Sequence, residues 1–215
     1  MTMIVQSLTK EFQHCEALVR ANPKNPRAYI ERGMAHFKLA QIPESLRDFD
    51  YATQLDANLI PYLWQRGLSL YYADRFTEAA NQFELDLTVN GRDIEETIWL
   101  YLCIARLEGG DVARNRLVRT VYPVRQDPRS FMQSIYDFYA GACDLDEVLA
   151  EGRQSDRAMF YSHLYLGLYY EVMADVAQAQ FYLMLAAEQF PLPDYMWHLA
   201  CVHKQLRGWT TSSGN

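Results

Sequence analysis

The chain has 215 residues, of which 50% are hydrophobic, and a formal net charge of −7. This hydrophobic content is too high for a disordered chain and fits one continuous folded domain. The acidic balance argues against nucleic-acid binding, because phosphates would be repelled over most of the surface. No apolar run reaches the roughly 18–20 residues of a membrane span, and no signal peptide is visible. We therefore expect a cytoplasmic protein, although an exported chain whose targeting segment had been removed would look the same.

The first predicted element is a single helix that ends at Asn22 and Pro23. Phe12, Cys15 and Val19 recur at the spacing of one helix face. Proline disfavours helical backbone in the residue before it, so Pro23 marks the end of this helix. We expect the helix to lie unpaired before the first repeat.

Two copies of one apolar pattern follow, and they are 34 residues apart. The aligned pairs are Gly33 with Gly67, Ser45 with Ala79, and Phe49 with Phe83. A 34-residue period with this order of glycine, small residue and phenylalanine is the signature of the tetratricopeptide repeat, a pair of antiparallel helices. Glycine on the first helix allows the second helix to approach closely, because any Cβ atom would hold the backbones apart.

The later copies are less regular. Tyr101 takes the place of the glycine in a degenerate third repeat, residues 127–152 fit a shrunken repeat, and Gly167 centres another clear copy. The prediction is a single all-α domain over residues 1–209, a right-handed superhelix or α-solenoid of stacked helix pairs. Its parts are repeats at 26–59, 60–93, 94–127, 128–159 and 160–193, a terminal capping helix at 194–208, and a disordered tail at 210–215.

Repeats of this kind expose certain positions of each first helix on the inner face of the superhelix. In this chain these positions are mostly apolar or aromatic, and the predicted groove consists of Ile30, Met34, Phe37, Lys38, Trp64, Leu68, Tyr71, Tyr72, Ile98, Leu102 and Arg106. The equivalent positions also include Glu95, Tyr161 and Glu171. An apolar inner face indicates that something covers it. Two interpretations stay open: an adaptor or scaffold that binds a partner segment, or a structural homo-oligomer whose groove is filled by its own helices or a second copy.

One subfamily of these repeats clamps the terminal carboxylate of chaperone tails with lysine and asparagine side chains and with further basic side chains at fixed positions. Those positions here hold Ile30, Met34, Leu68, Glu95 and Trp99. The clamp is absent, so we expect a protein or peptide partner of another kind.

Catalytic and cofactor motifs are missing from the sequence. There is no His-Glu-x-x-His, no glycine-rich phosphate loop and no Gly-x-Ser-x-Gly. His198 and Cys201 share a helix face, but His203 points elsewhere, so we expect no metal site. His163 occupies a packing position and is interpreted as a core histidine. We expect no enzyme activity and no cofactor, and the scattered cysteines favour a reducing compartment.

A local cluster of arginines departs from the acidic character of the chain. It comprises Arg106, Arg114, Arg116, Arg119, Arg125 and Arg129. The cluster fits either a patch for an acidic partner or a solvated helix face, and we favour the solvated face.

Over about residues 62–208 the chain resembles the NlpI-type tetratricopeptide lipoproteins of bacterial outer membranes. The resemblance rests on Thr97-Ile98-Trp99-Leu100-Tyr101-Leu102 and on the stretch from Ile135 to Gly141, followed by the repeat around Gly167. It implies a homodimeric adaptor that brings enzymes to their substrates. No lipid-acceptor cysteine precedes these residues, so periplasmic partners are not implied.

Overall fold

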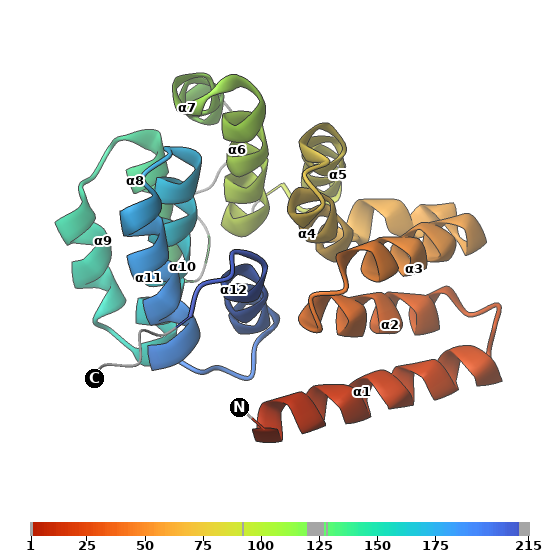
Figure 1. The fold of residues 1–215 in the computed structure, drawn as a ribbon. Helices are drawn as coiled ribbons and strands as arrows, with labels where there is room; N and C mark the ends of the chain where they lie inside the picture. Colours follow the sequence, from red (N-terminus) through yellow and green to blue (C-terminus); the bar gives the residue numbers. More distant parts are fainter. Residues whose placement is uncertain (1, 92, 120–126, 128, 211–215) are drawn as a thin grey trace. The chain divides into compact units, whose positions relative to one another are not determined.

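The computed structural model describes residues 2–91, 93–119, 127 and 129–210 (Figure 1). Within these residues every regular element is a helix, and there are thirteen of them. The chain groups into two compact units, unit 1 over Met1–Val89 and unit 2 over Asn90–Asn215. The fold is a tetratricopeptide-like α-solenoid of adjacent helix pairs, as predicted. The single continuous domain stays a prediction.

Unit 1 contains an unpaired helix, two helix pairs and a short 3₁₀ helix. In chain order these are α1 (Thr2–Ala21), α2 (Pro26–Lys38), α3 (Ile42–Leu55), η1 (Ala57–Tyr62), α4 (Trp64–Tyr72) and α5 (Phe76–Val89). Helix α1 packs against α2, α2 pairs with α3, and α4 pairs with α5 (Figure 1). Helix η1, which was not predicted from the sequence, packs against α5.

Unit 2 contains three helix pairs and a last single helix. These are α6 (Ile94–Glu108), α7 (Gly110–Arg119), α8 (Ser130–Ala140), α9 (Leu145–Gly152), α10 (Asp156–Val172), α11 (Val176–Gln189) and α12 (Tyr195–Leu206). The first helix of the shrunken repeat, residues 127–152, begins at Ser130, with Arg129 in the preceding cap position. Residues 211–215 of the predicted tail lie outside the described residues.

The turns inside the five helix pairs share one backbone feature. Each contains a residue with positive φ between the two helices, namely Ala40, Asp74, Gly109, Gly141 and Ala174. Ala40 and Asp74 are 34 residues apart, so the turn repeats with the same period as the sequence pattern. This left-handed turn reverses the chain and sets the two helices of each pair antiparallel.

The glycine positions confirm the expected close approach of helices. A Cβ atom added to Gly67 would lie 2.7 Å from Cζ of Phe83, which is fully buried. At Gly167 an added Cβ would lie 3.0 Å from the backbone nitrogen of Leu183. Such distances are shorter than van der Waals contact, so the pairs α4–α5 and α10–α11 require glycine there.

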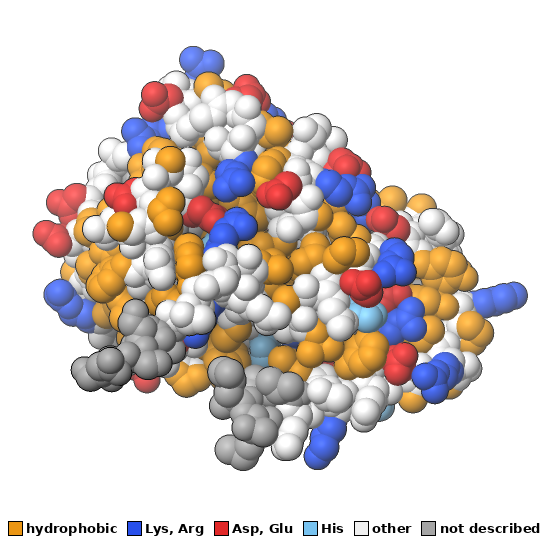
Figure 2. Space-filling view, viewed as in Figure 1, with side chains coloured by type: hydrophobic (Ala, Val, Ile, Leu, Met, Phe, Trp, Pro, Cys, Tyr) orange, Lys and Arg blue, Asp and Glu red, His pale blue; other side chains and the backbone are white. Residues whose placement is uncertain are grey.

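The surface mixes charges of both signs. On the face shown in Figure 2, lysine and arginine side chains lie among acidic and hydrophobic ones without forming one large field. Among the described residues, no helix combines the length and apolar character that crossing a lipid bilayer demands.

Candidate functional site

Three of the groove residues predicted in unit 1 are core residues in the structure. Phe37, Leu68 and Tyr71 are at most 2% exposed. Their side chains fill the space between neighbouring helices, since the same apolar pattern serves packing between repeats as well as an inner surface. A partner cannot contact these three side chains without repacking the unit.

Helix α1 contacts one further predicted groove residue, Lys38, and contributes to the apolar cluster beside another, Ile30. Lys38 Nζ lies 2.7 Å from Oε1 of Glu11, which belongs to α1. Ile30, half-buried, packs against the apolar cluster that contains Val19 of α1. The unpaired helix therefore covers part of the predicted groove in unit 1.

The remaining predicted groove residues of unit 1, Met34, Trp64 and Tyr72, are partly exposed. The Tyr72 ring lies edge-on to the Phe37 ring at 5.7 Å, which ties the end of α4 to α2. We call these three residues the aromatic surface of unit 1.

The groove residues predicted in unit 2 are either completely buried or exposed. Ile98 and Leu102 are completely buried, whereas Arg106 is exposed near the end of α6. The middle of α6 is thus a core helix, and its two apolar positions offer no surface to a partner.

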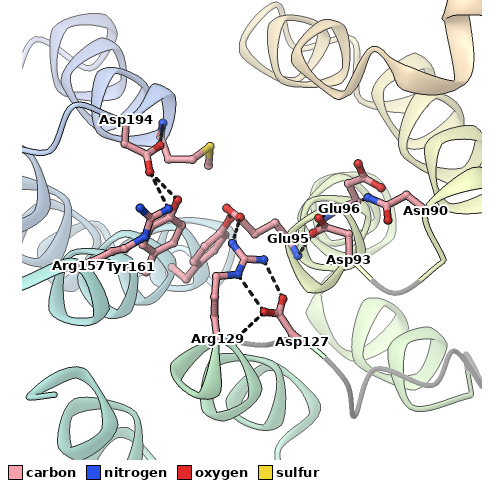
Figure 3. Close-up of polar contacts among 11 residues, drawn as sticks. Asn90, Asp93, Glu95, Glu96, Asp127, Arg129, Arg157, Tyr161 and Asp194 are labelled. Atoms are coloured by element: carbon pink, nitrogen blue, oxygen red, sulfur yellow. Dashed lines mark hydrogen bonds and ion pairs between the residues drawn. The ribbon is translucent and has the colours of Figure 1, made fainter. Parts of the chain in front are cut away.

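A polar network occupies other inner positions of unit 2 (Figure 3). At its centre, Arg129 forms a two-pronged ion pair with Asp127, with Nε–Oδ1 at 2.9 Å and Nη2–Oδ2 at 2.7 Å. Nη1 of the same guanidinium donates to Oε2 of Glu95 on α6. The Asp127 side chain is only 4% exposed. Arg129 therefore links the segment before α8 to the first turn of α6.

The network continues across α10 to the start of α12. The Tyr165 hydroxyl donates to Oε1 of Glu95 at 2.8 Å, and the Tyr161 hydroxyl donates to Oδ2 of Asp194 at 3.0 Å. Arg157 Nη2 reaches the same Asp194 oxygen at 3.1 Å. Oδ1 of Asp194 caps α12 by accepting from the Met196 backbone nitrogen. We call Glu95, Asp127, Arg129, Arg157, Tyr161, Tyr165 and Asp194 the polar network of unit 2.

Burial and charge pull the pKa values in this network in opposite directions. Burial alone would lower the pKa of Arg129, but Asp127 and Glu95 outweigh it and raise that pKa. Burial alone would raise the pKa of Asp127, but hydrogen bonds from the side chain and backbone of Arg129 lower it. Burial raises the pKa of Glu95 against the opposing charge of Arg129. Arg129 and Asp127 are therefore a charged, mostly buried pair at neutral pH, and such a pair fixes the position of the helices it joins.

Glu95 and Tyr161 were predicted to lie on the inner face, but their hydrogen-bond partners in the same chain were not predicted. Glu95 and Arg129 are 34 residues apart, so they occupy equivalent positions of successive repeats and carry opposite charges. That spacing is the signal that predicts the pair. Arg129 was instead predicted to belong to the arginine cluster.

The other members of the arginine cluster lie in several environments. Arg114 donates to the Tyr169 hydroxyl at 2.9 Å, and Arg125 lies outside the described residues. Arg106, Arg116 and Arg119 are exposed.

Two histidines of unit 2, His163 and His203, are buried among side chains of the same unit. His163 is buried between the rings of Tyr182 and Phe190, and burial lowers its pKa to about 4, which confirms a core histidine. Nε2 of the buried His203 lies 3.4 Å from Oε1 of Glu171. Within the described residues, no group of three or more His, Cys, Asp and Glu side chains is arranged to hold a metal ion.

Comparison with known proteins points to the same repeat class. No family model matches the chain. An Hsp70-Hsp90 organizing protein of Triticum aestivum is 22% identical over 126 residues, which cover 57% of this chain and 22% of that protein. The Hsp70-Hsp90 organizing protein 2 of Arabidopsis thaliana is 24% identical over 119 residues, which cover 54% of this chain and 21% of that protein. The chain spans about a fifth of the length of the curated relatives it matches.

These relatives contain tetratricopeptide repeats, and together with the helix pairs they support a tetratricopeptide-like helical repeat in this chain. They are not NlpI-type lipoproteins, so the comparison gives that more specific resemblance no support.

Proposed function

We propose that the chain is a non-catalytic adaptor that binds a segment of a partner protein on the aromatic surface of unit 1. The observation that carries the proposal is the half-exposed state of Met34, Trp64 and Tyr72 beside a buried aromatic core. Large amphipathic side chains on a rigid helical support commonly dominate protein–protein interfaces. The buried Phe37 beneath Tyr72 supplies that support.

The kind of partner follows from which side chains are present. The names of the relatives describe the organisation of two proteins, Hsp70 and Hsp90, which is consistent with an adaptor. This chain, however, has Ile30, Met34 and Leu68 where a carboxylate clamp needs lysine or asparagine. We therefore propose a partner segment that is recognised through apolar and aromatic contacts rather than through a terminal carboxylate. A homodimeric adaptor of NlpI type stays a hypothesis.

A structural role is the second candidate, because α1 already covers part of the predicted groove. The ion pair between Lys38 and Glu11 of α1 supports this candidate, because it brings one of the chain's own helices to a predicted groove residue. A homo-oligomer would complete the cover with a second copy of the chain.

Trp64→Ala tests the adaptor proposal, and Tyr62→Ala is the matched control because Tyr62 is an exposed aromatic residue on η1. Partners are captured from cells of the source organism with the wild-type chain and both variants, and identified by mass spectrometry. We expect some proteins to bind the wild type and Tyr62→Ala but not Trp64→Ala. The substitution of Trp64 should reduce the binding free energy of these proteins by about 2 kcal/mol or more.

Circular dichroism establishes that both variants keep their helices, and light scattering measures the oligomeric state. A dimer that dissociates in Trp64→Ala would favour the structural role. If the folded Trp64→Ala variant captures every wild-type partner, the aromatic surface is not the binding site.

A further inference from the structure

Side chains from α6, α7 and the end of α10 meet at one place in unit 2. Gly110 and Arg114 are four residues apart on one side of α7, and Tyr169 and Met173 have the same spacing at the end of α10. Arg114 Nη2 donates to the Tyr169 hydroxyl at 2.9 Å. A Cβ atom added to Gly110 would lie 2.6 Å from Sδ of Met173 and 3.8 Å from the hydroxyl of Tyr101 on α6. We call these five residues the Arg114 cluster.

The Arg114 cluster contains two hydrogen-bond donors without an acceptor among the described residues. They are Nε of Arg114 and the hydroxyl of Tyr101, and both atoms are shielded from solvent. The whole Tyr101 side chain is buried, with 1% of the residue exposed. Leaving a buried polar group without a partner is unfavourable, and folded proteins commonly satisfy such groups with a bound water molecule or ion. The two donors are therefore available to a small ligand.

The charges around the two donors favour an anion over a water molecule. Within the described residues, no carboxylate forms an ion pair with Arg114. Burial raises the pKa of Tyr101 to about 12, so its hydroxyl keeps the proton that it can donate. Gly110 is the first residue of α7, where the N–H groups of the first turn carry a partial positive charge. Asp111, exposed in the same turn, acts on Tyr101 with the opposite sign, so the cluster suits one negative charge better than two.

We propose that the Arg114 cluster binds a small monovalent anion of the size of chloride. Nε of Arg114 and the Tyr101 hydroxyl donate to the ion, and the guanidinium group compensates its charge. Tyr169 holds the guanidinium group in place through its hydroxyl. Met173 is half-buried against Gly110 and closes the site, so a larger anion is excluded. The proposal goes beyond the adaptor function, because all of its residues lie in unit 2.

Urea unfolding of the full chain at constant ionic strength tests the proposal. Sodium chloride replaces sodium gluconate stepwise, because gluconate is too large for the cluster. A ligand that binds only the folded chain stabilises it in proportion to its saturation. Chloride at about ten times its dissociation constant should therefore raise the folding equilibrium constant by about tenfold. Broadening of the chloride NMR line on addition of the protein gives a second and direct measurement of binding.

Tyr101→Phe is the decisive variant, because it removes only the hydroxyl without an acceptor. This variant should lose most of the chloride response, and it should be at least as stable as the wild type in gluconate. Arg114→Gln should lose the response altogether, whereas Arg153→Gln, at an exposed arginine of unit 2, is the matched control and should keep it. Asp111→Asn should tighten chloride binding by about twofold, because it removes the opposing charge.

Equal chloride responses in the wild type and in Tyr101→Phe would overturn the proposal, because the response would then be a general effect of salt. So would a wild-type chain that shows neither line broadening nor a chloride response up to about 0.3 M, since water alone would then satisfy the two donors. Circular dichroism verifies that all variants stay helical. Trp64→Ala should keep the chloride response, which separates this outcome from a failure of the aromatic surface.

Discussion

Unit 1 and unit 2 hold their helices together in different ways. In unit 1 the ion pairs Arg32–Asp48 and Arg66–Asp50 each join residues 16 apart in the sequence, on consecutive α-helices. In unit 2 the polar contacts reach much further along the chain: Arg129 to Glu95 spans 34 residues, Arg114 to Tyr169 spans 55, and Tyr165 to Glu95 spans 70.

The difference follows the regularity of the repeats. Both helix pairs of unit 1 keep the glycine that permits close packing, and local contacts between neighbours are then sufficient. The first pair of unit 2 has Tyr101 at this position, and its buried ring packs against Tyr139 at 4.9 Å. Where a repeat loses its glycine, contacts between non-adjacent helices take over part of the stabilisation.

The largest expected effect comes from breaking the polar network of unit 2. Arg129→Met leaves Asp127 and Glu95 mostly buried without their cation, which should cost about 3–5 kcal/mol in the free energy of unfolding. Urea unfolding measures this loss, and hydrogen exchange by mass spectrometry locates it. We expect faster exchange in α6, α8 and α10.

Arg75→Met is the control, because Arg75 pairs with Glu78 on the exposed surface of unit 1. Exposed pairs of this kind contribute up to about 1 kcal/mol. If both variants lose the same small amount of stability, the network is not what holds unit 2 together.

An intermediate effect is expected when alanine replaces the repeat glycines. Its size should differ among them, because the distance from an added Cβ atom to the nearest atoms differs. At Gly167 the added Cβ meets the backbone of Leu183 at 3.0 Å and its Cγ at 2.5 Å, so Gly167→Ala should destabilise by about 2–3 kcal/mol. At Gly67 the nearest atoms belong to the Phe83 ring, a side chain that can shift, and a loss of about 1–2 kcal/mol is expected. At Gly33 nothing lies closer than 3.3 Å. The higher helix propensity of alanine, up to about 1 kcal/mol, should then make Gly33→Ala nearly neutral.

Urea unfolding of the three variants gives the ranking directly. Equal losses at all three positions would show that flexibility of glycine, and not helix proximity, is what the repeat requires.

Much of the fold could be predicted from the sequence because the repeat contacts are local and periodic. Gly67 and Phe83 belong to one helix pair, and the 34-residue period identifies both residues independently of the rest of the chain. The polar network was missed because Glu95 and Tyr165 meet only once α6 and α10 are placed in three dimensions. Ile98 and Leu102 show a second limit: an apolar helix position has the same pattern whether it faces a groove or a core. Whether the three half-exposed residues of unit 1 bind a partner stays a prediction.

The smallest effect concerns pH, and here two buried carboxyl groups should act in opposite directions. Asp86 in unit 1 is 1% exposed, and its Oδ2 atom has no hydrogen-bond partner within the described residues. Burial raises its pKa from 3.8 to about 7. Glu171 in unit 2 is different: burial alone would raise its pKa, but His203 and Arg207 lower it to about 2. One unit thus contains a buried acid without a direct ionic partner, and the other contains a paired one.

The signs follow from comparing each group with its unfolded value. Asp86 ionises more easily in the unfolded chain, so the unfolding free energy should fall as pH rises from about 4 to 7, by about 1–2 kcal/mol if water partly relieves the buried charge. Asp86→Asn should remove that slope, whereas Glu44→Gln, at an exposed carboxyl of unit 1, should keep it. Glu171 stabilises unit 2 above its unfolded value of 4.5, and this contribution should be lost as pH falls from 4.5 towards 2. Urea titrations of the wild type and of each variant, at half-unit pH steps, measure both slopes. A wild-type curve in which Asp86→Asn changes nothing between pH 4 and 7 would show that this carboxyl reaches water in the folded chain, and the contrast between a paired and an unpaired buried acid would then disappear.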